Sequence, residues 1–258
     1  MRCPAAHPGS VHELHGDMQP SQMAVLDRIR LTGSLPSVSS GPYWKGGVAL
    51  ASFALVGASD MNAEAFLSLE REGAFDEVIA VDGGYDHLRR LGIDAGLAIG
   101  DFDSLGFVPE GIRIEEFPAH KDESDMELAL EAANAMGCDR AYVFGALGGR
   151  LDHTLANLQV LSKASEQGMN VTAIGMREEV RFLTGPSEVV LEGRVGGTVS
   201  VFAMSDIVEG LVERGLEWEL EGEELCNRTS LGLSNVIRSP IASISVGAGT
   251  IAVVSSLG

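Results

Sequence analysis

The chain has 258 residues with 18 basic and 37 acidic side chains, which gives a formal net charge of −19. A surface of this sign repels nucleic acid and anionic membranes, so polyanion binding is excluded as a main function. The three cysteines, Cys3, Cys138 and Cys226, are odd in number and far apart, which argues against a disulfide framework or a zinc site and favours a cytoplasmic protein.

Residues 1–46 differ in composition from the rest of the chain. They contain five of the nine prolines and three of the six histidines. Such a stretch buries too little apolar surface to offset its ordering entropy, so we predict a flexible extension, with a short helix at most around Gln22–Leu31. It lacks the apolar core of a signal peptide, and the longest apolar run, Val48–Ala58, is too short to span a bilayer.

From residue 47 to about residue 176, strand-like apolar runs alternate with helical patterns. This alternation predicts a parallel, doubly wound, Rossmann-like α/β domain. The clearest helix has apolar residues at helical spacing from Met126 to Met136 and is closed by Gly137. The other expected helices are Asn62–Glu72, Tyr85–Leu91 and Leu151–Gln167, and the expected strands are Ala49–Gly57, Glu77–Val81, Leu97–Ile99, Ile112–Phe117, Ala141–Phe144 and Val171–Ile174.

Residues 177–258 have a different pattern, with short β-runs separated by Gly, Pro, Asn and Ser and no convincing helix. We predict a second, smaller all-β domain in the form of a sandwich or a barrel. Its expected strands are Val180–Leu183, Glu188–Leu191, Thr198–Ala203, Ile207–Val212, Asn235–Ile237, Ala242–Val246 and Thr250–Val254.

Four clusters of acidic residues and glycines each follow a strand-like run in the first domain. In an open α/β sheet, loops that leave the carboxyl ends of the strands converge on one crevice, where ligands bind. Converging carboxylates need a cation between them, and glycines with an arginine suit phosphate, so the pattern indicates a Mg²⁺-nucleotide site. The four clusters are Asp82–Gly84, Gly100–Ser104, Lys121–Asp125 and Gly148–His153.

Asp101 and Asp103 are the strongest candidates for metal ligands. Side chains two apart in an extended turn point the same way, so both carboxylates can share one cation while Phe102 anchors the loop. A lone D-x-D is also typical of a β-turn, in which the aspartates cap backbone amides. Asp125 joins the set only if the two loops converge.

The clusters Lys121–Asp125 and Gly148–His153 each lie at the start of an expected helix, and their residues have both structural and functional interpretations. Ser124 and Glu127 form an S-x-x-E capping box, and Asp125 suits the positive end of the helix dipole. Gly148 and Gly149 let backbone amides approach a phosphate at a helix N-terminus. Arg150 can bind phosphate oxygens, and Asp152 either orients Arg150 or caps the helix beside His153.

Taken together, the motifs resemble those of the thiamine pyrophosphokinase family. The resemblance runs in order from about residue 50 to residue 258, outside the N-terminal extension. It rests on D-G-G, G-D-F-D-S, D-x-[ST]-D-x-E-x-A-L, G-G-R-x-D-H, G-L-x-[YW]-x-L and S-N, which are here Asp82–Gly84, Gly100–Ser104, Asp122–Leu130, Gly148–His153, Gly215–Leu220 and Ser234–Asn235.

The resemblance implies a homodimer that transfers the diphosphate of ATP to the hydroxyl of thiamine, with sites at the subunit interface. It implies that the Mg²⁺ ligands are Asp101, Asp103 and Asp125, and that Asp82 lies by the reacting groups. The implied nucleotide-binding residues are Gly83, Gly84, Ser104, Asp122, Ser124, Gly148, Gly149, Arg150, Asp152 and His153, and the implied thiamine-binding residues are Trp218, Ser234 and Asn235.

Two alternatives stay open. The first is diphosphate transfer to another heterocyclic alcohol, such as a hydroxymethylpterin, against which the S-N pair and Gly215–Leu220 favour thiamine. The second is a regulator that binds nucleotide or thiamine without catalysis, which loss of a metal carboxylate would have supported; the sequence shows no such loss.

Overall fold

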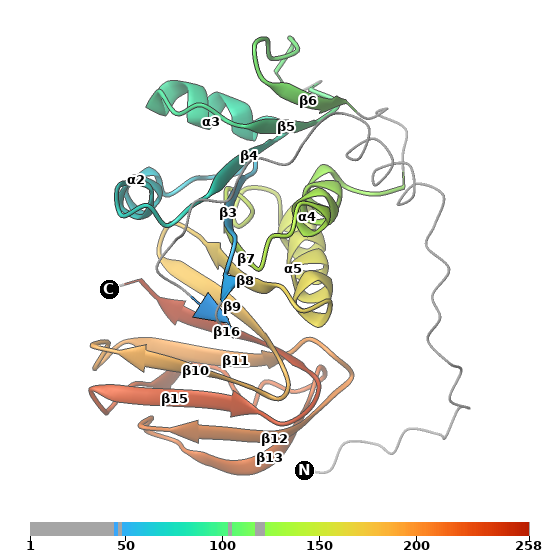
Figure 1. Cartoon of the computed structure of the whole chain (residues 1–258). Helices are drawn as coiled ribbons and strands as arrows, with labels where there is room; N and C mark the ends of the chain where they lie inside the picture. Colours follow the sequence, from blue (N-terminus) through green and yellow to red (C-terminus); the bar gives the residue numbers. More distant parts are fainter. Residues whose placement is uncertain (1–43, 46–47, 103–104, 117–121, 258) are drawn as a thin grey trace.

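The computed structural model describes residues 44–45, 48–102, 105–116 and 122–257 (Figure 1). Nearly all of the expected N-terminal extension, including the helix expected at Gln22–Leu31, lies outside the described residues. The described chain begins with a short antiparallel pair, β1 (Trp44–Lys45) and β2 (Val48–Ala49). None of the helices in the described part is long and apolar enough to cross a membrane.

A parallel sheet with helices on both faces forms the first half of the fold. Its strand order is β6-β5-β4-β3-β7-β8, and all neighbouring strands in it are parallel. The strands are β3 (Ser52–Val56), β4 (Glu77–Val81), β5 (Leu97–Gly100), β6 (Arg113–Glu116), β7 (Arg140–Phe144) and β8 (Asn170–Ile174). The helices are α2 (Ala63–Arg71), α3 (Gly84–Leu91), α4 (Asp125–Ala135) and α5 (Leu151–Glu166).

The alternation of side chains along β3 shows how the helices are distributed. Phe53 and Leu55 pack in one core with residues of α4 and α5, whereas Ala54 and Val56 pack in another with residues of α2 and α3. Because successive residues of a strand point to opposite faces, these two cores lie on the two faces of the sheet. Figure 1 shows the same arrangement, with α2 and α3 on one side and α4 and α5 on the other.

The helix ends follow from local chemistry that the sequence displays. Asn62 caps α2, since its side chain accepts a hydrogen bond from the Ala65 amide at 3.0 Å. Gly92 ends α3 in the left-handed conformation, with φ 68°, which glycine adopts without steric cost. The helices expected from sequence therefore begin and end within one or two residues of those observed.

The C-terminal part is made of strands alone within the described residues, and half of them join the first sheet. Strand β9 pairs antiparallel with β8, and β16, β11 and β14 follow, so the order β14-β11-β16-β9-β8-β7-β3-β4-β5-β6 makes one ten-stranded sheet. The mixed α/β class is confirmed. The change of sequence pattern near residue 176, from which we expected a second domain, corresponds to a reversal of strand direction within one sheet. The joining strands are β9 (Glu178–Thr184), β11 (Thr198–Ala203), β14 (Asn235–Val236) and β16 (Thr250–Ser256).

A second sheet of four antiparallel strands, in the order β10-β15-β12-β13, packs on this C-terminal half. A third core contains buried residues of both sheets, including Val201 and Val253 from the large sheet and Leu211 and Ile244 from the small one. Strand β13 was not predicted, because its sequence is acidic and mostly exposed. The four strands are β10 (Ser187–Glu192), β12 (Ile207–Arg214), β13 (Leu220–Cys226) and β15 (Ile241–Val246).

We predict that Phe66→Ala lowers the free energy of unfolding by about 3–5 kcal/mol, because it leaves a cavity in the core under α2. Phe66 is fully buried, and its ring centroid lies 5.2 Å from that of Phe144. The matched control is Phe107→Ala, which removes a ring that is 44% exposed and should cost about 1 kcal/mol or less. Equal losses in urea unfolding of the two variants would contradict the assignment of Phe66 to the core.

Candidate active site

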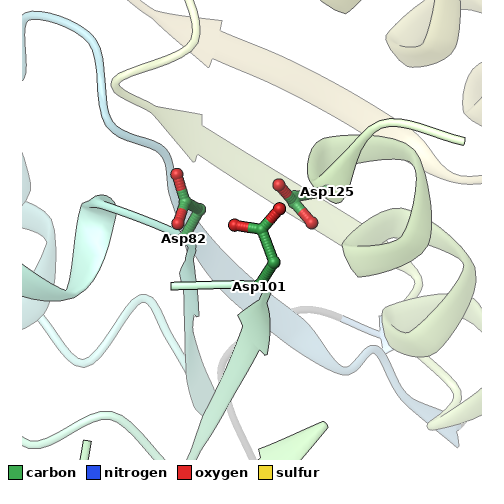
Figure 2. A group of neighbouring side chains, drawn as sticks. All are labelled: Asp82, Asp101 and Asp125. Carbon is green, nitrogen blue, oxygen red and sulfur yellow. The ribbon is translucent and has the colours of Figure 1, made fainter. Parts of the chain in front are cut away.

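Three aspartates meet at the carboxyl end of the parallel strands. Asp82 follows β4, Asp101 follows β5, and Asp125 is the first residue of α4. Each offers a carboxylate oxygen within 4.8 Å of those of the other two, and Figure 2 shows the three side chains turned toward one another. Carboxylates this close repel one another unless a cation lies between them, and hard oxygen ligands suit Mg²⁺. The donor set therefore fits a magnesium ion.

The backbone of two neighbouring turns creates this proximity. Asp82 has φ 46°, a left-handed conformation that is uncommon outside glycine, and its amide donates to the Ile99 carbonyl at 2.7 Å. Gly100 has φ 151°, and a Cβ at this position would lie 3.0 Å from the Cα of Asp82. A glycine before Asp101 therefore allows the two turns to pack against each other.

The N-terminus of α4 brings in the third carboxylate. The Ser124 side chain caps the helix by accepting from the Glu127 amide at 3.2 Å, as expected. The Glu127 carboxylate, expected to complete a capping box, accepts from Lys163 Nζ of α5 at 2.8 Å. This ion pair fixes α4 against α5 and so holds the helix end that carries Asp125.

A cavity of about 300 Å³ lies at the aspartate cluster. Of the residues expected at the site, Asp82, Asp101, Ser124, Asp125 and His153 line it. Asn157 was missed, although its place four residues after His153, on the same face of α5, is a signal that the sequence contains. The other lining residues are Gly57, Ala58, Ser59, Val81, Glu123, Met126 and Gly145.

The end of β3 is in close backbone contact with the start of α3 and with the residue after β7. A Cβ at Gly145 would lie 2.2 Å from the Gly57 carbonyl oxygen, and a Cβ at Gly84 would lie 1.7 Å from the Val56 carbonyl oxygen. Real side chains do not approach so closely, so both positions require glycine. The second glycine of the D-G-G motif thus serves the packing of α3 on β3.

Arg150 and Asp152 lie at the start of α5 and are paired with each other. Arg150 donates to both carboxylate oxygens of Asp152, at 3.2 and 2.6 Å, and this hydrogen bonding lowers the pKa of the Asp152 carboxyl. Their side chains are 73% and 65% exposed, and neither lines the cavity. The pair is therefore open to a ligand that extends out of the cavity.

The remaining nucleotide candidates are distributed around this edge. Gly83 is the residue before α3, Gly148 and Gly149 both have positive φ in the loop before α5, and Asp122 is exposed. The carbonyl of Gly148 accepts hydrogen bonds from the Ser59 and Thr154 hydroxyls. Asp103 and Ser104 lie outside the described residues.

The expected thiamine-binding residues lie at the other end of the large sheet. Trp218 is 61% exposed and hydrogen-bonds with Asn235, which belongs to the edge strand β14. Ser234 has φ 61° and donates its amide to Ser200 Oγ at 2.9 Å. Strand β14 is first and β5 ninth in the sheet order, so about 35–40 Å of sheet separates Asn235 from Asp101, at about 4.8 Å per strand.

Comparison with known proteins identifies the relatives of this chain. The sequence model described as thiamin pyrophosphokinase, catalytic domain, matches residues 74–173, which include all three clustered aspartates. The thiamine pyrophosphokinase of Bacillus subtilis (strain 168) is 30% identical over 165 residues, which are 61% of this chain and 76% of that protein.

Solved structures show the same fold. The crystal structure of the Bacillus subtilis thiamine pyrophosphokinase has a TM-score of 0.67 at 24% identity and covers 80% of this chain and 98% of its own. A thiamin pyrophosphokinase family protein from Enterococcus faecalis has a TM-score of 0.66 at 26% identity, with 81% and 100% covered. The yeast thiamin pyrophosphokinase has a TM-score of 0.64 at 13% identity, with 83% and 88% covered. The sequence match and the shared fold together show that this chain belongs to the thiamine pyrophosphokinase family.

Proposed function

We propose that this protein transfers the diphosphate group of ATP to the hydroxyl of thiamine, giving thiamine diphosphate and AMP. The observation that carries the proposal is the cluster of Asp82, Asp101 and Asp125 around a cavity within the region that matches the family. Diphosphoryl transfer needs positioning and neutralisation of charge more than covalent help from the protein. A carboxylate cluster beside an anion-binding helix end suits those needs. The cytoplasmic location expected from the cysteine content is part of the same proposal.

Asp82, Asp101 and Asp125 would hold the Mg²⁺ ion. The bound ion would neutralise phosphate charge and stabilise the charge that develops on the leaving AMP. This set adds Asp82 to the ligands expected from sequence, because its carboxylate offers an oxygen within 4.8 Å of those of the other two. Asp103 stays in the proposal as a further ligand, on the strength of the D-F-D motif alone.

The N-terminus of α5 and the loop before it would bind the phosphates of the nucleotide. Glycines with positive φ leave backbone amides open to an anion, and the helix end favours negative charge. The Arg150 guanidinium, oriented by Asp152, can make paired hydrogen bonds to phosphate oxygens. Gly83, Gly84, Ser104, Asp122, Ser124 and His153 complete the proposed nucleotide site.

Trp218 would provide the platform for thiamine. The thiazolium ring of thiamine is cationic, and a cation over the face of a tryptophan is attracted by the ring quadrupole. The indole is exposed and Glu219 is its neighbour in the chain, so a cationic heterocycle would meet an aromatic face close to a carboxylate. Ser234 and Asn235 border this platform.

The separation of the two proposed sites supports a homodimer. No small substrate bridges 35–40 Å of sheet, so Trp218 of one copy would serve the aspartates of a second copy. A symmetric dimer repeats that contact twice and gives two shared sites. A Rossmann-like domain for ATP at 47–176 and a β-domain for thiamine and dimer contacts at 177–258 are part of this proposal.

The defining experiment measures AMP release from Mg-ATP by the purified protein, with and without thiamine. We expect AMP only with thiamine, in equal amounts with thiamine diphosphate, because one transfer forms both products. Release of AMP with a hydroxymethylpterin but not with thiamine would mean that the acceptor is a pterin and not thiamine. Binding of ATP without AMP release in the presence of either acceptor would mean that the protein is a binding protein and not an enzyme.

We predict that Asp101→Asn lowers kcat on the order of 100-fold or more, because it removes a charged ligand from an ion that contributes several kcal/mol. Circular dichroism and the melting temperature should match those of the parent protein. The matched control is Asp94→Asn, an exposed aspartate before the opposite end of β5, which should leave kcat unchanged. A near-normal rate for Asp101→Asn would contradict the assignment of Asp101 as a metal ligand.

A mixing experiment tests the shared site. Asp101→Asn and Trp218→Ala homodimers should both be nearly inactive at a thiamine concentration far below the KM of Trp218→Ala. After unfolding and refolding together, half of the dimers would be mixed and each would carry one intact site, so about a quarter of the parental activity should return. No recovery, with mixed dimers demonstrated by differently tagged chains, would place both residues in the same subunit's site.

A further inference from the structure

Strand β12 carries a buried carboxyl group where its pattern calls for an apolar residue. Leu211 and Glu213 are both buried, at 0% and 2% exposure, while Val212 between them is half-buried. Both therefore face the core between the two sheets, since side chains two apart in a strand share a face. A residue that breaks the local rule in this way is expected to have a functional reason.

The described contacts of Glu213 point to one neighbour. Its Oε2 accepts from Asn235 Nδ2 at 3.0 Å, while Oε1 is buried with no hydrogen-bond partner among the described residues. Burial raises the pKa of the Glu213 carboxyl, against a smaller opposing effect of the Asn235 hydrogen bond. Burial therefore makes the charged form of this carboxyl more costly than it is in water. The bond also joins β12 of the small sheet to β14 of the large one.

Asn235 in turn holds the main chain of Trp218 on both sides. Its Oδ1 accepts from the Trp218 amide at 3.2 Å and from the Val236 amide at 2.9 Å. Its Nδ2 donates to the Trp218 carbonyl at 2.7 Å and to Glu213 at 3.0 Å. An asparagine side chain has two donor and two acceptor positions, so all four are used. Asn235 thus has no hydrogen-bonding group left for a substrate, although its sequence motif suggested such a contact.

Further hydrogen bonds and an ion pair hold the loop that contains Trp218. The Gly215 amide donates to Glu219 Oε1 at 2.6 Å, and the Glu217 amide donates to the Val236 carbonyl at 2.9 Å. Glu217 also forms an ion pair with Arg238. The result is a fixed main chain under an indole that is 61% exposed, which is the arrangement of a preorganised binding platform.

We propose that Glu213 is a positioning residue that, through Asn235, fixes the main chain of Trp218 and thereby sets the affinity for the acceptor substrate. The acceptor class is a cationic aromatic heterocycle that stacks on the indole. The identity of the acceptor in this inference rests on the proposed function. The structural link from Glu213 through Asn235 to Trp218 is independent of that function.

The test compares Glu213→Met with Glu213→Gln, two side chains of similar length. Glutamine keeps an acceptor for Asn235, and methionine does not. We expect Glu213→Met to raise the thiamine KM about tenfold or more, because a buried amide donor loses its partner, and to change the ATP KM little. Glu213→Gln should keep the parental thiamine KM. The control Leu211→Ala should lower stability through a cavity in the same strand while leaving the thiamine KM unchanged.

A second readout needs no substrate. Trp44 and Trp218 are the two tryptophans of the chain, so in a Trp44→Phe background the time-resolved anisotropy of fluorescence reports Trp218 alone. Glu213→Met should give Trp218 a larger fast-motion amplitude, and Glu213→Gln should not. If Glu213→Met does not fold, Asn235→Asp replaces it, because aspartate keeps the shape and loses both N–H donors.

Unchanged Trp218 motion in Glu213→Met would overturn the proposal, and so would equal increases of the thiamine and ATP KM values. A looser Trp218 with an unchanged thiamine KM in an active enzyme would overturn it as well. If the parent protein forms no AMP with thiamine, the proposed function is wrong. The link from Glu213 to Trp218 is then decided by the anisotropy comparison alone.

Discussion

The hydrogen-bond ladder between β8 and β9 is the interaction on which the rest of the structure depends. It pairs four residues of each strand, from Val171–Phe182 to Ile174–Glu179, and turns a parallel sheet into an antiparallel one without a break. Through this ladder, one continuous sheet contains both the strands that precede Asp82 and Asp101 and the edge strand β14, whose Asn235 is hydrogen-bonded to Trp218. Their separation is therefore built into the fold, and it is the reason why the proposed function requires a second copy of the chain.

The proposed nucleotide site would bind an anion at an acidic cluster of an acidic protein. A protein of net charge −19 repels a nucleotide, yet the aspartate cluster adds more negative charge where the nucleotide would bind. A bound divalent cation would offset most of this negative charge, and the exposed Arg150 places a positive group beyond the cluster. The cation and the helix end would thus determine where an anion can approach a mostly acidic surface.

Sequence reasoning predicted the helices and strands of the parallel half well, because its strands are buried on both faces and its helices carry clear caps. It did not foresee the continuous sheet, since an apolar run does not reveal which edge it will pair with. Asp82 was placed beside the site and not in the metal set, because its closeness to Asp101 depends on the left-handed turn and on Gly100. Glu213 was overlooked because the predicted strand ended at Val212, one residue before it.

The length of β14 has a consequence for self-association. The large sheet ends at this strand, which has only two residues, Asn235 and Val236. A long exposed edge would offer a row of unpaired amides and carbonyls on which another chain could add a strand, a common route to aggregation. A two-residue edge offers very few such groups, so the border of the sheet beside Trp218 can stay open to a small molecule while giving amyloid-like growth almost no template.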